Sequence, residues 1–173
     1  MSYIVVCPLD RVTETAHRHK AGAMVTLLSQ AHDMHRPAII AREHHLVLTL
    51  NDIAANATTP GLIAPAASHV ESLIGFVRAW QRQAPLLLHC WMGISRSPAA
   101  ALIAALVLDP AQGDDHIVNR LRRASPSATP NQGLIALADG MLGRNGRLIA
   151  AVRQIGRGED AVTGEPFRFD ISG

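Results

Sequence analysis

The sequence has little net charge, few aromatic residues and no long apolar stretch. The formal net charge is +2, so bulk electrostatics suggest neither nucleic acid nor a lipid surface as a partner. Nowhere do about 20 apolar residues run together, which argues against a membrane-spanning helix. The N-terminus has no basic stretch followed by a long apolar core, and no repeat or low-complexity tract occurs. We therefore expect a soluble, cytoplasmic protein.

The residues that are present suit a single folded domain. The chain has 173 residues, 48% of them apolar, which is enough for a sizeable core in one domain. We assign residues 1–158 to this domain. From Glu159 onward glycine and charge dominate, so residues 159–173 are predicted to form a C-terminal tail that is either draped over the surface or disordered.

Short apolar runs alternate with amphipathic stretches along most of the chain, which is the pattern of an α/β protein. The predicted strands are 3–7, 23–28, 46–50 and 85–90, with a short strand or helix at 38–41. The predicted helices are 11–20, 65–81, 97–108, 114–124 and 131–142, with one more within 143–158. The helix at 97–108 is apolar all round, so it should run through the interior. We expect a central, mostly parallel sheet of about four to five strands flanked by helices, in three layers.

Five residues separate Cys90 from Arg96 at the end of an apolar run. A loop of this length between a buried strand and a helix N-terminus can turn its backbone N–H groups inward, while the arginine closes a ring around a tetrahedral oxyanion. Gly93 lies in mid-loop, where a residue without Cβ can take a positive φ and let the backbone approach an anion. The segment therefore predicts a phosphate-binding loop, made of Trp91, Met92, Gly93, Ile94, Ser95 and Arg96.

Cys90 would lie at the centre of this loop and act as a nucleophile. Helix N-termini, nearby cations and hydrogen-bond donors all favour the reactive thiolate form of a cysteine. The sequence provides each of them in a helix start near Pro98, the guanidinium of Arg96 and the hydroxyl of Ser97. The alternative interpretation is an inert cysteine of the core. The histidine, glycine and serine that surround the Cys-x5-Arg spacing favour the phosphate-binding loop.

Residues 89–97 resemble the signature loop of the cysteine-dependent protein-tyrosine phosphatase superfamily. The Gly-Ile-Ser-Arg-Ser of residues 93–97 resembles the dual-specificity branch, and we expect a member of bacterial type. The order of a strand, Asn51-Asp52, a helix and then the loop is also that of the family. The resemblance covers roughly residues 3–142 and implies a phosphatase-like three-layer sandwich.

The resemblance also implies the catalytic roles. Cys90 would attack phosphorus, Arg96 would bind the phosphoryl oxygens, Asp52 would protonate the leaving oxygen, and Ser97 would assist breakdown of the phosphoenzyme. Neither a metal nor another cofactor is implied. Asp52 can also be read as an ordinary turn residue, and Asp10 and Asp33 are its rivals for the role of acid.

Other residues near the loop have structural interpretations that we prefer. His89 is expected to orient the loop by hydrogen bonding, with a proton-shuttle role as the alternative. Asn131 and Gln132 fall where related phosphatases begin a helix near the site, and an N-cap is the simpler interpretation. Cys7 is interpreted as a buried apolar residue, and the alternative is a resolving thiol that protects Cys90 after oxidation. A disulfide between the two is disfavoured, because the loop needs a free thiol.

The loop interior carries no lysine and no additional arginine, so a singly phosphorylated substrate fits better than an inositol phosphate or an RNA 5′-phosphate. We expect a phosphorylated protein or peptide, with phosphotyrosine and also phosphoserine or phosphothreonine as its modified residue. The alternatives are a phosphate-binding adaptor without turnover, a phosphatase of a small-molecule or lipid phosphate, and sulfur transfer or arsenate reduction on a similar loop. The clustered histidines have no convincing metal-ligand spacing. The sequence leaves the oligomeric state open.

Overall fold

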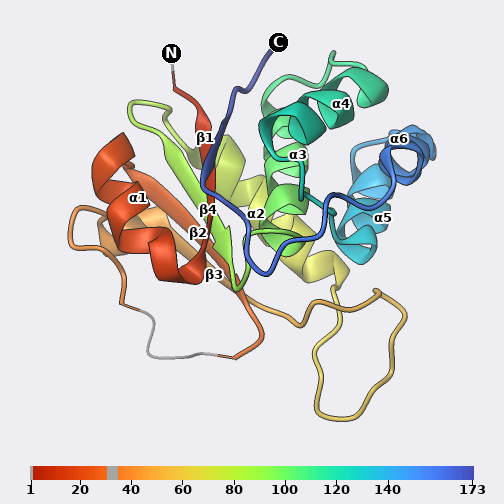
Figure 1. Cartoon of the computed structure of the whole chain (residues 1–173), viewed down its shortest axis with the longest axis horizontal. Helices are drawn as coiled ribbons and strands as arrows, with labels where there is room; N and C mark the ends of the chain where they lie inside the picture. The colour runs from red at the N-terminus through yellow and green to blue at the C-terminus, as the bar shows by residue number, and fades with distance from the viewer. Residues whose placement is uncertain (1, 31–34) are drawn as a thin grey trace.

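The computed structural model describes residues 2–30 and 35–173. Its strands are β1 (Ile4–Pro8), β2 (Ala23–Leu28), β3 (His45–Thr49), β4 (Leu86–Cys90) and β5 (Phe167–Phe169). They form one sheet in the order β3-β2-β4-β1-β5, in which β5 is antiparallel to β1 and all other pairs are parallel (Figure 1). The predicted mostly parallel sheet is therefore confirmed.

The three inner strands β1, β2 and β4 are buried at every residue. Nearly continuous apolar runs of this kind are expected where both faces of a parallel sheet are covered. The edge strand β3 is more exposed, and its Val47 side chain is 53% accessible. The carboxyl ends of β2, β3 and β4 lie at one edge of the sheet, and this edge carries the predicted loop.

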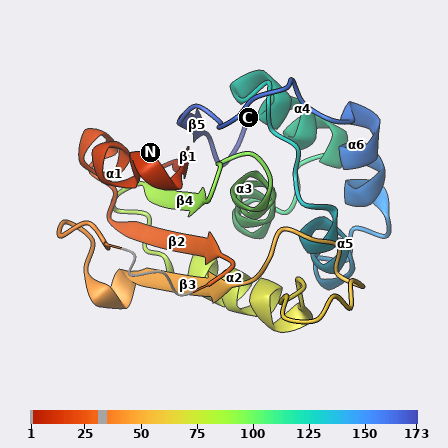
Figure 2. The same ribbon diagram turned by 60° about the horizontal axis from the view of Figure 1, so that its bottom comes forward.

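Helices cover both faces of the sheet (Figure 2). They are α1 (Val12–His19), α2 (Ala67–Ala79), α3 (Arg96–Leu108), α4 (Asp114–Ala124), α5 (Gln132–Met141) and α6 (Arg147–Ile155). Helix α1 packs on one face against a cluster that includes Val5, Met24 and Leu87. The other helices share the core on the opposite face. Helix α3 is buried from its first residue to Leu106, as predicted for an interior helix.

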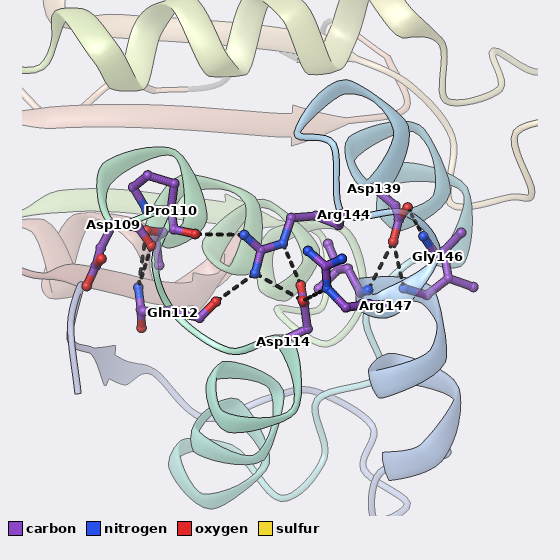
Figure 3. Close-up of polar contacts among 11 residues, drawn as sticks. Asp109, Pro110, Gln112, Asp114, Asp139, Arg144, Gly146 and Arg147 are labelled. Carbon is purple, nitrogen blue, oxygen red and sulfur yellow. Dashed lines mark hydrogen bonds and ion pairs between the residues drawn. The ribbon is translucent and has the colours of Figure 1, made fainter.

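A buried ion pair ties α4 to the connection between α5 and α6 (Figure 3). Arg144 contacts the Asp114 carboxylate at 2.8 Å and donates to the carbonyl oxygens of Pro110 and Gln112. The first turn of α6 is capped by the Asp139 carboxylate, which accepts backbone N–H groups from Gly146, Leu148 and Ile149. These contacts hold the three helices together beside α3.

The fifth strand lies in the segment for which no regular structure was predicted. Phe167 and Phe169 are buried and Arg168 between them is exposed, so the tail adds an antiparallel strand to the sheet. The short strand or helix predicted at 38–41 is wrong, because a turn occupies 38–40 and a 3-10 helix follows at Arg42–His44. Among residues 2–30 and 35–173, no helix is long and apolar enough to cross a membrane.

Candidate active site

The predicted loop joins the end of β4 to the start of α3. Cys90 is the last residue of the strand and Arg96 is the first residue of the helix, and their side chains are 2% and 6% exposed. The apolar strand and the interior helix thus fix both ends of the loop within the core. Residues 91–95 connect these two points, and we call residues 90–96 the phosphate loop.

The carbonyl groups of the phosphate loop are bonded to backbone N–H groups outside it. The carbonyl oxygens of Trp91, Met92, Ile94 and Ser95 accept from the N–H groups of Leu9, Gly164, Thr129 and Asn131, at 3.1, 2.8, 2.8 and 3.2 Å respectively. In a trans peptide the N–H of the following residue points opposite to the carbonyl. The N–H groups of residues 92, 93, 95 and 96 are therefore directed toward the inside of the loop, an arrangement that can bind an anion.

Gly93 lets the loop lie against the end of β1. Its φ is +69°, a conformation that costs a residue with a Cβ about 1–2 kcal/mol. A Cβ atom at this position would lie 2.8 Å from the backbone nitrogen of Pro8 and 3.0 Å from the carbonyl carbon of Cys7. Both the conformation and the packing therefore require glycine here.

The nucleophile candidate has a hydroxyl partner at the N-terminus of α3. The Sγ atom of Cys90 lies 3.0 Å from the Oγ atom of Ser97, so the hydroxyl can donate to a thiolate. The positive end of the α3 dipole favours an anion at the same place. One nitrogen of the Arg96 guanidinium donates to the Leu50 carbonyl at 2.8 Å, which fixes the side chain against the strand-end segment.

Asp52 lies beside the phosphate loop. Its Oδ1 atom accepts from the Ser95 hydroxyl at 2.6 Å and from the Asn131 side-chain amide at 2.8 Å. The segment that follows is closed by a reciprocal pair, because the Asn51 N–H donates to the Ile63 carbonyl and the Ile63 N–H donates to the Asn51 side chain. The carboxylate is thus held against Ser95 of the phosphate loop and the start of α5. Asp33 lies outside the described residues, and the exposed Asp10 has no described side-chain hydrogen bond to the loop.

No family model matches the sequence, and no curated protein matches it. Solved structures do match the fold. A putative dual specificity phosphatase from mouse, complexed with zinc tungstate, has a TM-score of 0.60 and 22% identity, over 83% of this chain and 84% of that one. Human DUSP28 has a TM-score of 0.61 and 18% identity, over 81% of this chain and 88% of that one.

The fold is that of the dual-specificity phosphatases. A third match is the human tyrosine phosphatase-like serine/threonine/tyrosine-interacting protein, with a TM-score of 0.58 and 15% identity over 81% of this chain and 91% of that one. Its name describes it as phosphatase-like, so the dual-specificity phosphatase fold does not by itself decide the chemistry. The chemistry depends on the side chains and peptide groups of the phosphate loop.

Within this dual-specificity phosphatase fold, His89 is a neutral, buried hydrogen-bonding group. Its Nε2 atom lies 2.7 Å from the Thr26 hydroxyl, which in turn lies 2.8 Å from Nε2 of His45. Burial lowers the pKa of His89 to about 3, and the positive charges of His45 and Arg96 act in the same direction. An imidazole with this pKa does not gain a proton near neutral pH, which argues against a proton shuttle. The described side-chain hydrogen bond of His89 goes to Thr26 of β2 and not to the phosphate loop, so its role in orienting the loop stays a prediction.

Cys7 lies on the other face of the sheet from Cys90. Cys7 pairs in register with His89, and side chains alternate along a strand, so Cys7 joins the α1 side while Cys90 joins the α3 side. Burial raises the pKa of the Cys7 thiol to about 12, with a smaller opposing effect of its hydrogen bond to Thr15. These observations favour a buried core residue and give no support to a resolving thiol.

Sequence reasoning predicted Asn131 as an N-cap near the site and missed several other residues that hold the site. Asn131 does cap α5, since its Oδ1 atom accepts the Leu134 N–H at 2.9 Å, but it also donates to Asp52. Gly133 allows close packing, because a Cβ there would lie 2.7 Å from the Ala55 nitrogen in the segment after Asp52. Leu9, Thr129 and Gly164 act through backbone N–H groups, for which no side-chain pattern exists. In the part of the chain that the structure describes, no three His, Cys, Asp or Glu residues are grouped to hold a metal ion.

Proposed function

We propose that this protein is a phosphomonoesterase that hydrolyses phosphoproteins through a cysteinyl-phosphate intermediate. One observation carries the proposal: the four bonded carbonyls of the phosphate loop face outward, so that peptide N–H groups face the space that Cys90 and Arg96 close. The Nε atom of Arg96 is buried and has no hydrogen-bond partner among the described residues. A buried donor of this kind is normally satisfied, and a phosphoryl oxygen would satisfy it.

In the first step the Cys90 thiolate attacks phosphorus. A sulfur–phosphorus bond forms, the bond to the leaving oxygen breaks, and protonated Asp52 gives its proton to that oxygen. The loop N–H groups and the Arg96 guanidinium bind the three non-bridging oxygens as their charge changes. Such preorganised donors supply the electrostatic stabilisation of the transition state.

In the second step water attacks the phosphorus atom of the intermediate. Asp52, now ionised, takes a proton from the water, and the sulfur–phosphorus bond breaks with its electron pair returning to Cys90. The Ser97 hydroxyl, 3.0 Å from the sulfur, donates to the departing thiolate. Inorganic phosphate leaves and the protonated acid is regenerated, so the cycle needs no added reductant or oxidant.

The surroundings of the site suit a singly phosphorylated side chain. The loop residues between Cys90 and Arg96 include no cation that would meet a second phosphate. Trp91 in the loop and Ile63 next to Asn51 are large apolar side chains that are 49% and 45% exposed, and they suit the ring of phosphotyrosine. We propose phosphotyrosine as a substrate, with phosphoserine and phosphothreonine accepted as well, in the reducing cytoplasm that a free thiol requires.

Hydrolysis of p-nitrophenyl phosphate tests the reaction. Turnover should proceed with a metal chelator present, be inhibited by vanadate, and disappear in Cys90→Ser, whereas Cys7→Ser should hydrolyse at the rate of the native protein. A panel of phosphotyrosine, phosphoserine and phosphothreonine peptides would then give the preference. Phosphopeptide binding without release of phosphate would instead identify a non-hydrolysing adaptor and overturn the proposal.

A further inference from the structure

The segment between α6 and β5 passes directly beside the phosphate loop. Figures 1 and 2 show it crossing next to the connection from β4 to α3 before it turns into β5. The Gly164 N–H donates to the Met92 carbonyl at 2.8 Å, and the Thr163 hydroxyl lies 3.4 Å from the same oxygen. We call residues 158–165 the strap.

The strap is held in place at both ends. At its start, the Gly158 N–H donates to the Thr129 hydroxyl and the Glu159 N–H donates to the Pro126 carbonyl. At its end, β5 pairs with β1 and buries two phenylalanine side chains. The strap therefore approaches the loop from a fixed position, and Gly164 allows this approach because a Cβ there would lie only 3.0 Å from the Gly93 carbonyl oxygen.

The contact fixes the orientation of a single peptide group. Because the Met92 carbonyl points to the strap, the Gly93 N–H points to the inside of the phosphate loop. Glycine tolerates both signs of φ, so the peptide before Gly93 is the one in the loop that can turn over at the lowest conformational cost. If it turned over, a carbonyl oxygen would replace an N–H group toward the bound anion.

We propose that Gly164, assisted by Thr163, is a positioning residue for phosphoryl transfer, which acts by holding the Met92–Gly93 peptide with its N–H toward the phosphoryl oxygens. The inference rests on the proposed function and adds to it a catalytic dependence on the C-terminal segment. Neither residue touches the substrate. Their effect passes through one hydrogen bond to the loop.

The test replaces the donor and keeps the chain length. In Gly164→Pro the N–H is lost, and we expect kcat/KM for p-nitrophenyl phosphate to fall by about 10- to 100-fold, approaching the effect that loss of one oxyanion donor has in an enzyme. Inhibition by vanadate should weaken by a similar factor. Gly164→Ala keeps the N–H and introduces the tight Cβ contact, so its losses should be about threefold. Val162→Pro is the matched control, because Val162 is 86% exposed and has no described hydrogen bond from its N–H.

The melting temperature of each variant is measured as well. If the strap only stabilised the fold, the variants would have a lower melting temperature, but vanadate inhibition measured well below that temperature would not be weakened. Unchanged kcat/KM and vanadate inhibition in Gly164→Pro would overturn the inference, as would equal losses in Val162→Pro. If Gly164→Pro does not fold, the double variant Thr163→Val, Gly164→Ala takes its place, because it removes the Thr163 hydroxyl and crowds the strap against the loop; unaltered vanadate inhibition in it would overturn the inference. Tungstate binding to Cys90→Ser, with and without Gly164→Pro, tests the strap even if the native protein proves inactive. Failure of the proposed function can therefore be distinguished from failure of this inference.

Discussion

Replacing Asn131 should separate the stability of α5 from the positioning of the general acid. The Asn131 side chain makes three contacts: its oxygen accepts the Leu134 N–H at the start of the helix, and its nitrogen donates to Oδ1 of Asp52 and, at 3.2 Å, to the Ile53 carbonyl. Serine is an N-cap residue of similar quality, but its short side chain cannot cap the helix and also reach Asp52 and Ile53. Asn131→Ser therefore keeps the cap and removes the donor to Asp52, while Asn131→Ala removes both.

The expected magnitudes follow from these contacts. Loss of an N-cap costs about 1 kcal/mol of unfolding free energy, so Asn131→Ala should be destabilised by this amount and Asn131→Ser by only a few tenths. A hydrogen bond to a charged group contributes about 1.5–3 kcal/mol. Asp52 is exposed and keeps its bond to Ser95, so we expect the lower end, about 1.5 kcal/mol, which corresponds to a loss in rate of about tenfold.

The assay compares two leaving groups. Phenyl phosphate needs a proton on its leaving oxygen far more than p-nitrophenyl phosphate does, so both variants should lose about tenfold in kcat/KM on the former and less than threefold on the latter. Urea denaturation gives the stability of each protein. Equal losses on the two substrates would mean that Asn131 supports the loop and not the acid, and unchanged rates in Asn131→Ser would refute the reasoning altogether.

Four further substitutions or conditions test other parts of the structure. Gly93→Ala should lower the unfolding free energy by more than the 1–2 kcal/mol that a positive φ costs, because its Cβ would also meet the backbone of Pro8, and it should lose most of the inhibition by vanadate. Gly143→Ala is the matched control, because Gly143 has a φ of +63° and open space around it. Asp114→Ala should lower the unfolding free energy by about 3–5 kcal/mol, since it leaves the buried Arg144 charge unpaired, while the exposed Asp115→Ala should change it little. Burial lowers the pKa of His89 to about 3, so below the unfolded-state pKa near 6.5 the unfolded chain binds one more proton than the folded chain. As the pH falls from 6.5, the unfolding free energy should therefore decrease by up to about 1.4 kcal/mol per pH unit. Urea titrations at several pH values should show that the unfolding free energy depends less steeply on pH in His89→Asn. Iodoacetamide at neutral pH should label Cys90 and leave Cys7 unmodified, because burial raises the pKa of Cys7 to about 12; mass spectrometry of the peptides would reveal label on Cys7 if it were accessible.

The sequence was most informative where the pattern of apolar residues fits only one type of secondary structure. The strand at 23–28 and the helix at 114–124 match β2 and α4 at both ends, because an apolar run of six residues and an amphipathic stretch each fit one secondary structure. The junction at Cys90 was equally readable, since a buried strand, a glycine and a helix start fix the ends of the loop. β5 was missed because its Phe-Arg-Phe alternation is only three residues long and follows a stretch rich in glycine and charge.

The contacts that orient the phosphate loop were not readable, for a physical reason. The N–H donors to its four bonded carbonyls come from three separate parts of the chain, at Leu9, at Thr129 and Asn131, and at Gly164, and a backbone N–H is present in every residue except proline. Only the fold determines which backbone N–H lies next to each carbonyl. Residue type limits these contacts in only two ways. Proline cannot be a donor, and glycine is required where two backbones lie too close together for a Cβ atom, as at Gly93 and Gly164.

This distribution of donors has a consequence for the proposed chemistry. A Cys-x5-Arg segment in isolation would leave its peptide groups free to turn carbonyls toward an anion, and the dianionic phosphoryl group would then be repelled. In the folded chain, donors from the end of β1, from the entry to α5 and from the strap oppose that rearrangement simultaneously. Under the proposed function, the fold would therefore preorganise the oxyanion site before any substrate binds. We accordingly expect variants at the donor positions to change vanadate affinity and turnover together, although none of those residues contacts phosphorus.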